Sequence, residues 1–237
     1  MTASSFIVEN YLNVARGRVP GASVLHRFGA NIDIDSGTET IWTGGGLYPW
    51  SAWDNGASVL AVESNSSSDN GETLIIEGLN ANYEPVSDSI VLGDQTPVNT
   101  TVEFIRVLNM YGASNGGVSG RVTASIDGTT VAHIPAGKNQ TISAIYTVPA
   151  GKTGYIFYGD ASVSKNGDGV VEFFVRLQSG GGFRIQHLGE LYQNSYSYPF
   201  PVPLKLPPKT DLDVRFETPG NNARVTAAFD ILLVDGA

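Results

Sequence analysis

Hydrophobic and polar residues alternate along this chain in short runs, a period of two that is typical of β-strands with one buried face. The alternation is plain in 211–216 and 224–233, where every second residue is apolar, and no longer window shows a helical period. Such runs, bounded by Asn, Asp, Gly or Ser, predict ten strands at 58–63, 72–79, 102–111, 118–126, 140–148, 153–164, 169–178, 183–192, 211–217 and 224–233. We therefore expect an all-β protein, an antiparallel β-sandwich of jelly-roll-like arrangement.

The turn signals agree with this pattern. Residues 135–138 and 149–152 both read Pro-Ala-Gly-Lys, in which proline presets the first turn dihedral and glycine accepts a positive φ. The Asn-Gly-Asp-Gly run at 166–169 predicts a tight hairpin. The proline-rich stretch 198–208 cannot be a central strand, because proline donates no ladder hydrogen bond. We expect it to be an edge strand or a connection.

Residues 1–53 have a different pattern, with only brief alternation and all three tryptophans of the chain. This segment is too aromatic for a disordered tail and too irregular to form a core alone. It predicts an extended N-terminal arm over 1–53, packed on its own β-domain or on a neighbouring subunit, followed by one β-domain over 54–237.

Charge and composition exclude several classes of protein. The net charge of −9 argues against a general nucleic-acid binder, which needs a basic face. The absence of cysteine excludes disulfides and thiolate metal sites. No apolar run approaches the ~20 residues that span a bilayer, and the first residues lack the features of a signal peptide, so we expect synthesis and folding in a cytoplasm. Residues 54–103 carry nine acidic and no basic side chains, which indicates a solvated face, a cation site or a surface for a basic partner.

The titratable residues do not form a recognisable catalytic or metal-binding motif. The three histidines, at 26, 133 and 187, are far apart in the sequence, and the nucleotide, metalloprotease and serine-hydrolase motifs are all missing. Two sets of carboxylates are candidates for a catalytic pair: Asp160, Asp168 and Glu172 form one set, and Asp211 with Asp213 the other. Segments 69–71 and 166–169 carry oxygen ligands suited to Ca²⁺ but do not fit an EF-hand loop. We predict no catalytic residue, no metal site and no cofactor, and we expect that the protein is not an enzyme.

Aromatic side chains form the most conspicuous clusters. Large rings gather at 42–53, and together with nearby residues they predict an interaction surface made of Arg16, Arg18, Phe28, Trp42, Tyr48, Trp50 and Trp53. A second cluster beside the prolines, made of Tyr192, Tyr196, Tyr198 and Phe200, predicts a second interface. Three interpretations stay open for these rings: packing within the chain, an anchor to another subunit or a capsid, and a platform on which sugar rings stack.

Segments 24–31, 40–50, 147–153 and 203–212 resemble proteins encoded by marine and other tailed phages. The resemblance implies a virion structural protein, made in the host cytoplasm: a capsid decoration or cement protein, a head fibre or a tail-associated adaptor. It implies a homo-oligomer, with a trimer expected, that bridges subunits of the phage major capsid protein without nucleic-acid or membrane partners. One alternative is a tail or fibre-associated protein that binds host glycan. Another is a glycan depolymerase that uses Asp168 or Asp211.

Overall fold

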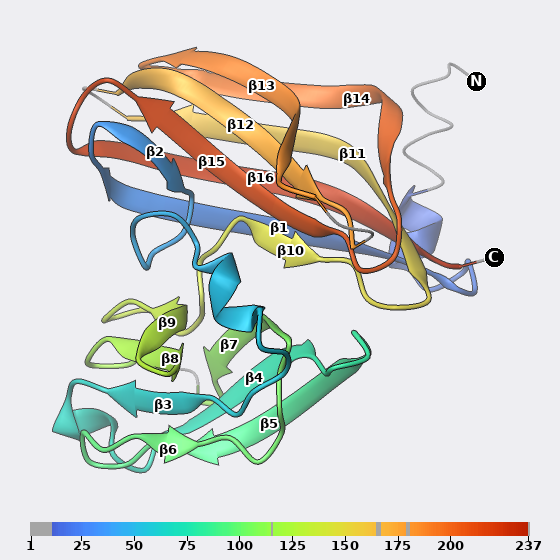
Figure 1. Cartoon of the computed structure of the whole chain (residues 1–237). Helices are drawn as coiled ribbons and strands as arrows, with labels where there is room; N and C mark the ends of the chain where they lie inside the picture. Colours follow the sequence, from blue (N-terminus) through green and yellow to red (C-terminus); the bar gives the residue numbers. More distant parts are fainter. Residues whose placement is uncertain (1–10, 115, 165–166, 179–180, 237) are drawn as a thin grey trace.

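The computed structural model describes residues 11–114, 116–164, 167–178 and 181–236. The described residues form four antiparallel sheets and almost no helix, as the alternating pattern predicts. Figure 1 shows these sheets in two units, a large unit at the top that contains the C-terminal strands and a small unit below it. The small unit is built from the middle of the chain.

The large unit consists of two sheets that share one core. The first sheet has the strand order β1 (Ala22–Ile34), β16 (Ala223–Asp235), β11 (Lys152–Val163) and β14 (Ser195–Leu206). The second has the order β10 (Ile145–Thr147), β15 (Asp211–Thr218), β12 (Asp168–Arg176) and β13 (Arg184–Tyr192), with β2 (Gly37–Thr40) also paired to β15.

Alternation along the strands determines how these two sheets pack. Every second side chain of β16 is buried, and the same holds for most of β12 and β15. Phe229 of the first sheet meets Phe173 of the second edge to face, with ring centroids 5.6 Å apart. The two sheets therefore lie face to face around one continuous hydrophobic core.

The small unit has its own core between two further sheets. One sheet has the order β6 (Val98–Asn99), β3 (Ala61–Ser64), β8 (Val122–Ile126) and β9 (Thr129–Ile134), and the other β5 (Pro85–Val91), β4 (Thr73–Leu79) and β7 (Arg106–Gly112). Two short 3₁₀ helices, η1 (Trp50–Trp53) and η2 (Ser67–Asp69), lie in its connections. Leu60, Phe104 and Met110 are among its fully buried side chains.

The small unit is an insertion between β2 and β10 of the large unit. Ala144 donates its backbone N–H to the Ile41 carbonyl oxygen at 2.9 Å, and Trp42 and Ser143 form an isolated antiparallel bridge. The chain therefore leaves the large unit and returns to it at one place. Because β2 and β10 both pair with β15, they act as two halves of one interrupted strand.

These findings confirm part of the predicted fold and correct the rest. Each of the ten predicted strands overlaps an observed strand, and Gly137 and Gly151 have the positive φ expected of the two Pro-Ala-Gly-Lys turns. The proline-rich stretch is strand β14, which lies at the edge of its sheet as expected. Asn166 of the predicted hairpin lies outside the described residues. The observed strands that the pattern missed are β1, β2, β5, β6 and β9.

The predicted domain division is wrong within the described residues. Residues 22–40 do not form an arm, because β1 pairs along its length with β16 and β2 pairs with β15. Apolar side chains on both faces of β1, such as Phe28 and Ile32 on the exposed face, hide the alternation that identifies a strand. The predicted single domain over 54–237 contains parts of two separate cores. Residues 1–10 of the predicted arm lie outside the described residues.

Candidate functional site

A buried ion cluster joins the two units at Asp211 of β15. Arg106, the first residue of β7 in the small unit, donates to both carboxylate oxygens of Asp211, through Nε at 2.9 Å and Nη2 at 3.0 Å. Arg176 of β12 donates to the same carboxylate at 2.7 Å, and the Thr147 hydroxyl donates at 2.6 Å. The Asp211 carboxylate thus has a hydrogen-bond partner on every side, and one of its partners belongs to the other unit.

A second carboxylate, Asp213, lies two residues along the same strand face. Its oxygens accept from the Trp50 indole N–H at 2.9 Å, from the Thr40 hydroxyl at 2.9 Å and from Arg215 Nη2 at 2.8 Å. Asp213 is fully buried, and a buried charge is stable only when it is paired and hydrogen-bonded. The Trp50 ring also packs against the Arg106 guanidinium, so the two carboxylates belong to one network.

Electrostatics keep this network charged. Burial alone would lower the pKa of Arg106, but its hydrogen bonds and ion pair with Asp211 outweigh burial and raise the pKa above its ordinary value. Arg106 therefore stays cationic inside the junction. Since every charge has a partner, this cluster holds the units together and leaves no carboxylate free to transfer a proton to a substrate.

The aromatic residues predicted to anchor another molecule lie inside this junction. Trp42, Tyr48 and Trp50 pack edge to face in series, with ring centroids 5.2 and 4.7 Å apart. Trp53 packs in the core of the small unit. All four rings are no more than 6 % exposed within the chain itself, so they do not form a surface to which a capsid or a second subunit could bind. Packing within the chain, one of the open interpretations, is what the structure shows.

The remaining members of that predicted surface lie elsewhere. Phe28 is 42 % exposed on the outer face of β1, and Arg16 and Arg18 are exposed in the turn that follows the helical residues 11–15. These three residues do not join the buried rings into one surface. Their part in an interface stays a prediction.

The candidate catalytic and calcium-binding carboxylates are not assembled into a site. Glu172 lies on the outer face of the second sheet and Asp160 lies in the first sheet, so these two do not form a pair in one cleft. Asp69 accepts hydrogen bonds from Ser64 Oγ at 2.5 Å and from the backbone N–H groups of Ser119 and Gly120, so it fixes a turn of the small unit. Within the described ranges, no three His, Cys, Asp or Glu side chains come together as metal ligands.

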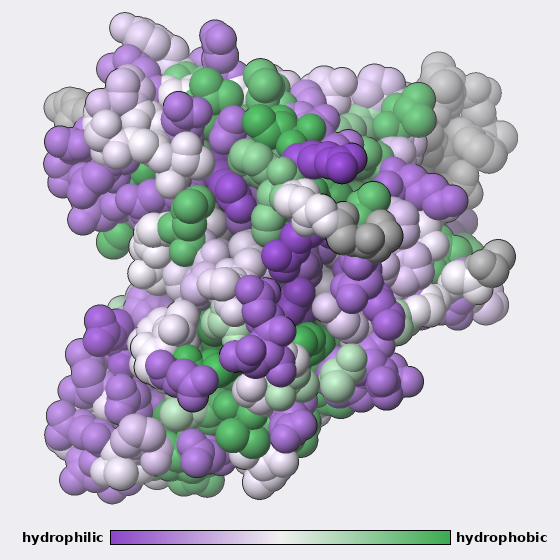
Figure 2. Space-filling model, viewed as in Figure 1, coloured by the Kyte–Doolittle hydropathy of each residue, from purple (hydrophilic) through white to green (hydrophobic). Residues whose placement is uncertain are grey.

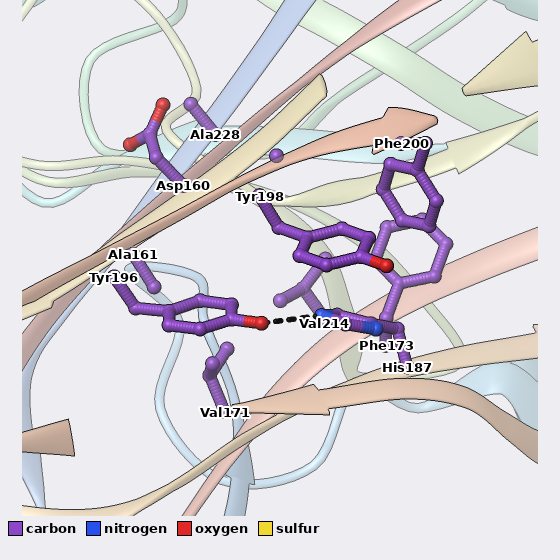
Figure 3. Close-up of a pocket in the computed structure, with 11 residues that line it drawn as sticks. Asp160, Ala161, Val171, Phe173, His187, Tyr196, Tyr198, Phe200, Val214 and Ala228 are labelled. Atoms are coloured by element: carbon purple, nitrogen blue, oxygen red, sulfur yellow. Dashed lines mark hydrogen bonds between the residues drawn. The ribbon is translucent and has the colours of Figure 1, made fainter. Parts of the chain in front are cut away.

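A pocket opens at the edge of the large unit where β13 and β14 bring the two sheets together (Figure 3). Alternate side chains of β14 and His187 of β13 form its aromatic rim, and the cavity has a volume of about 40 Å³. Phe173 and Val171 line its base, and the small residues Gly159 and Ala161 leave the opposite wall open. The rim residues of β14 are Tyr196, Tyr198 and Phe200.

The rim is held together by ring contacts. His187 stacks on Tyr198 with centroids 4.1 Å apart, and its Nε2 lies 2.9 Å from the Tyr196 hydroxyl, the contact drawn in Figure 3. The Tyr196 and Tyr198 rings are nearly parallel, at 6° with centroids 6.3 Å apart. Burial lowers the pKa of His187, which favours a neutral imidazole at neutral pH. The pocket is therefore aromatic, uncharged on this side and already formed.

Three of the four members of the second predicted aromatic cluster, Tyr196, Tyr198 and Phe200, lie together at this pocket, and their part in an interface stays a prediction. Tyr192 is the exception, because it lies on the outer face of β13 and is 73 % exposed. Sequence analysis missed His187, Gly159 and Ala161. A lone histidine and two small residues carry no signal until the fold brings β11 and β13 to the same edge.

Tyr192 belongs instead to an exposed apolar stripe along the outer face of β13. Ile185 and Leu188 on this face are 45 % and 54 % exposed. In Figure 2 hydrophobic colour gathers over β12 and β13 on the front of the large unit. We name Ile185, Leu188 and Tyr192 the β13 stripe.

Comparison with known proteins shows no family for this chain. No protein-family model matches it, and no curated protein matches it. Two solved structures described as infectious bursal disease virus, Gt strain and Gx strain, align at 11 % and 10 % identity with TM-scores of 0.26 and 0.21. The alignments cover 94 % and 90 % of this chain and 77 % and 70 % of those chains. Scores this low carry no argument about fold or function.

No helix among the described residues is long and apolar enough to cross a membrane.

Proposed function

We propose that this chain is a non-enzymatic virion structural protein, and more specifically that it is a capsid decoration protein of a tailed phage. In this proposal it assembles with itself, with a trimer expected, and bridges neighbouring major capsid subunits. It needs no cofactor and binds neither nucleic acid nor membrane.

The observation that carries the proposal is the strand order of the large unit. When β2 and β10 are counted as one strand, the large unit has eight strands. Numbered along the chain, these strands lie in the order 1-8-3-6 in the first sheet and 2-7-4-5 in the second sheet. We interpret this order as that of an eight-stranded jelly roll made of two Greek keys. Viral capsid proteins and lectins both use this architecture, so the support for a virion role is at the level of the fold.

Two features fit a structural role. The buried network around Asp211 fastens the inserted unit to the large unit, which suits a component that carries load between neighbours. The β13 stripe leaves large apolar side chains on a strand face, and such exposed patches often mark protein contacts. We assign this stripe to the contact between copies of the chain.

The test is the location of the protein in purified particles of the phage that encodes it, by cryo-electron microscopy. Density that spans adjacent capsid subunits supports the proposal. Density confined to the tail, or absence from the particle in mass spectrometry, overturns the decoration role.

A second candidate is glycan recognition by a tail or fibre-associated protein. The pocket between β13 and β14 favours it, because half-buried tyrosine rings around a small apolar cavity suit a sugar with an apolar substituent.

A further inference from the structure

We propose that the pocket between β13 and β14 binds the acetamido group of an N-acetylated amino sugar. The inference rests on the second candidate function, glycan recognition, and does not depend on where in the virion the protein lies. Four features carry it: the size of the cavity, the chemistry of its walls, the arrangement of its rings and the polar groups at its mouth.

The size of the cavity selects a small group. About 40 Å³ is room for roughly three water molecules by the same measure. An acetamido group has four non-hydrogen atoms and ends in a methyl, whereas a whole sugar ring or a benzene ring is too large. The pocket therefore takes a substituent of a ligand, and the rest of the ligand lies outside on the rim.

The walls select an apolar end for that substituent. Val171 and Phe173 at the base offer no hydrogen bond from their side chains, so water in the cavity gains little. A methyl group that replaces it buries apolar surface on both partners. Hexoses without the acetamido group have only hydroxyls to offer and leave the cavity unfilled.

The rim supplies contacts for the sugar ring itself. Tyr196 and Tyr198 are half-buried, and their nearly parallel rings reach from the cavity to the surface. The negative face of an aromatic ring attracts the C–H face of a sugar ring. A flat acetamido group also suits the space beside two parallel rings better than a branched group of equal volume.

Polar groups at the mouth match the amide. When His187 Nε2–H donates to the Tyr196 oxygen, the phenolic hydrogen is free to donate to the acetamido carbonyl oxygen. The site thus offers a hydrogen-bond donor to the carbonyl oxygen of the acetamido group.

The test is saturation-transfer NMR on the full chain, with N-acetylglucosamine and N-acetylgalactosamine against glucose and galactose at equal concentrations. The acetamido methyl is expected to show the strongest transfer, and the two plain hexoses little or none. Tetramethylammonium chloride is added as a competitor, because a rim of aromatic rings is also the chemistry of a cation cage.

Gly159 provides the decisive variant. A Cβ there would lie 3.7 Å from the Ala228 carbonyl oxygen and 4.0 Å from the Phe200 ring, both ordinary contacts, so Gly159→Ala fills the pocket without a clash. We expect it to weaken binding by about tenfold or more, since one methyl in a filled pocket discriminates by that order. Gly116→Ala is the matched control, because a Cβ there meets nothing within 4 Å.

The outcomes separate the ligand from the fold. Unchanged melting temperatures for both variants, with binding lost only in Gly159→Ala, support the proposal. Equal binding of glucose and N-acetylglucosamine, displacement by tetramethylammonium, or the same affinity in Gly159→Ala would each overturn it, as would the absence of any transfer. None of these results bears on whether the protein is found on the capsid.

Discussion

Arg106 and Asp211 form a two-bonded ion pair across the boundary between the two units, with both side chains buried. A guanidinium can match both oxygens of a carboxylate at once, which fixes orientation as well as distance. The pair therefore sets the angle at which β7 of the small unit meets β15 of the large unit.

Replacing Asp211 with alanine is expected to lower the free energy of unfolding by about 3–5 kcal/mol, because Arg106 and Arg176 would remain buried without their shared anion. Urea or guanidinium unfolding followed by circular dichroism measures the change. Asp235→Ala, which removes an exposed pair with Lys152, is the control and should cost less than about 1 kcal/mol. Equal losses in the two variants would mean that the buried network adds nothing beyond a surface pair.

Trp50→Phe is expected to destabilise the protein by about 1.5–3 kcal/mol, because it removes the indole N–H that Asp213 accepts while the ring is largely kept. Trp53→Phe is the matched control, since the Trp53 indole N–H donates to no carboxylate among the described residues. Thermal or urea unfolding of both variants measures the difference. If Trp53→Phe proves the more costly, ring packing and not the hydrogen bond determines stability here.

Acid is expected to weaken the small unit through Asp69. Burial alone would raise the pKa of Asp69, but hydrogen bonds from Ser64, Gly120 and Ser119 outweigh it and lower the pKa below the ordinary 3.8. The unfolded chain therefore binds the proton more readily, so this stabilisation is present above pH 3.8 and is lost as the pH falls through the lower folded value.

The measurement for this prediction is the free energy of unfolding between pH 6 and pH 2.5. Asp69→Asn should be less stable than the wild-type chain at pH 6, and the difference should shrink toward the acid end. The exposed Asp54→Asn serves as control. A difference between Asp69→Asn and wild type that stays constant over this range would contradict the assignment.

Leu188→Asp is expected to shift the protein toward the monomer, because it places a charge in the middle of the β13 stripe. Light scattering coupled to size-exclusion chromatography measures the mass. Val202→Asp, at an 81 % exposed position on β14, is the control and should leave the mass unchanged. A wild-type chain that is already monomeric at high concentration would remove the stripe from the proposed contact.

The sequence predicted the strands whose two faces differ and missed the strands whose faces are alike. β16 alternates strictly, and the predicted range 224–233 covers nearly all of it. β1 carries Phe28 and Ile32 on its exposed face, which hides the alternation, so the sequence predicts an arm there. The sequence shows Tyr196, Tyr198 and Phe200 as a cluster because they alternate within one segment, but it does not show a pocket. Gly159 and His187, on the other walls of the pocket, join these rings only through the pairing of distant strands.

The meeting of Ile41 and Ala144 has a consequence for how this chain folds. If the residues between β2 and β10 were flexible, pairing both strands with β15 would close a loop of about a hundred residues. Closing such a loop costs conformational entropy, and contacts between residues so far apart in sequence form slowly. A small unit that folds first holds its two ends side by side, so the long separation in sequence becomes a short one in space. The inserted unit then acts as an internal guide for assembly of the large unit, whose last partner strands, β15 and β16, are also the last to be synthesised.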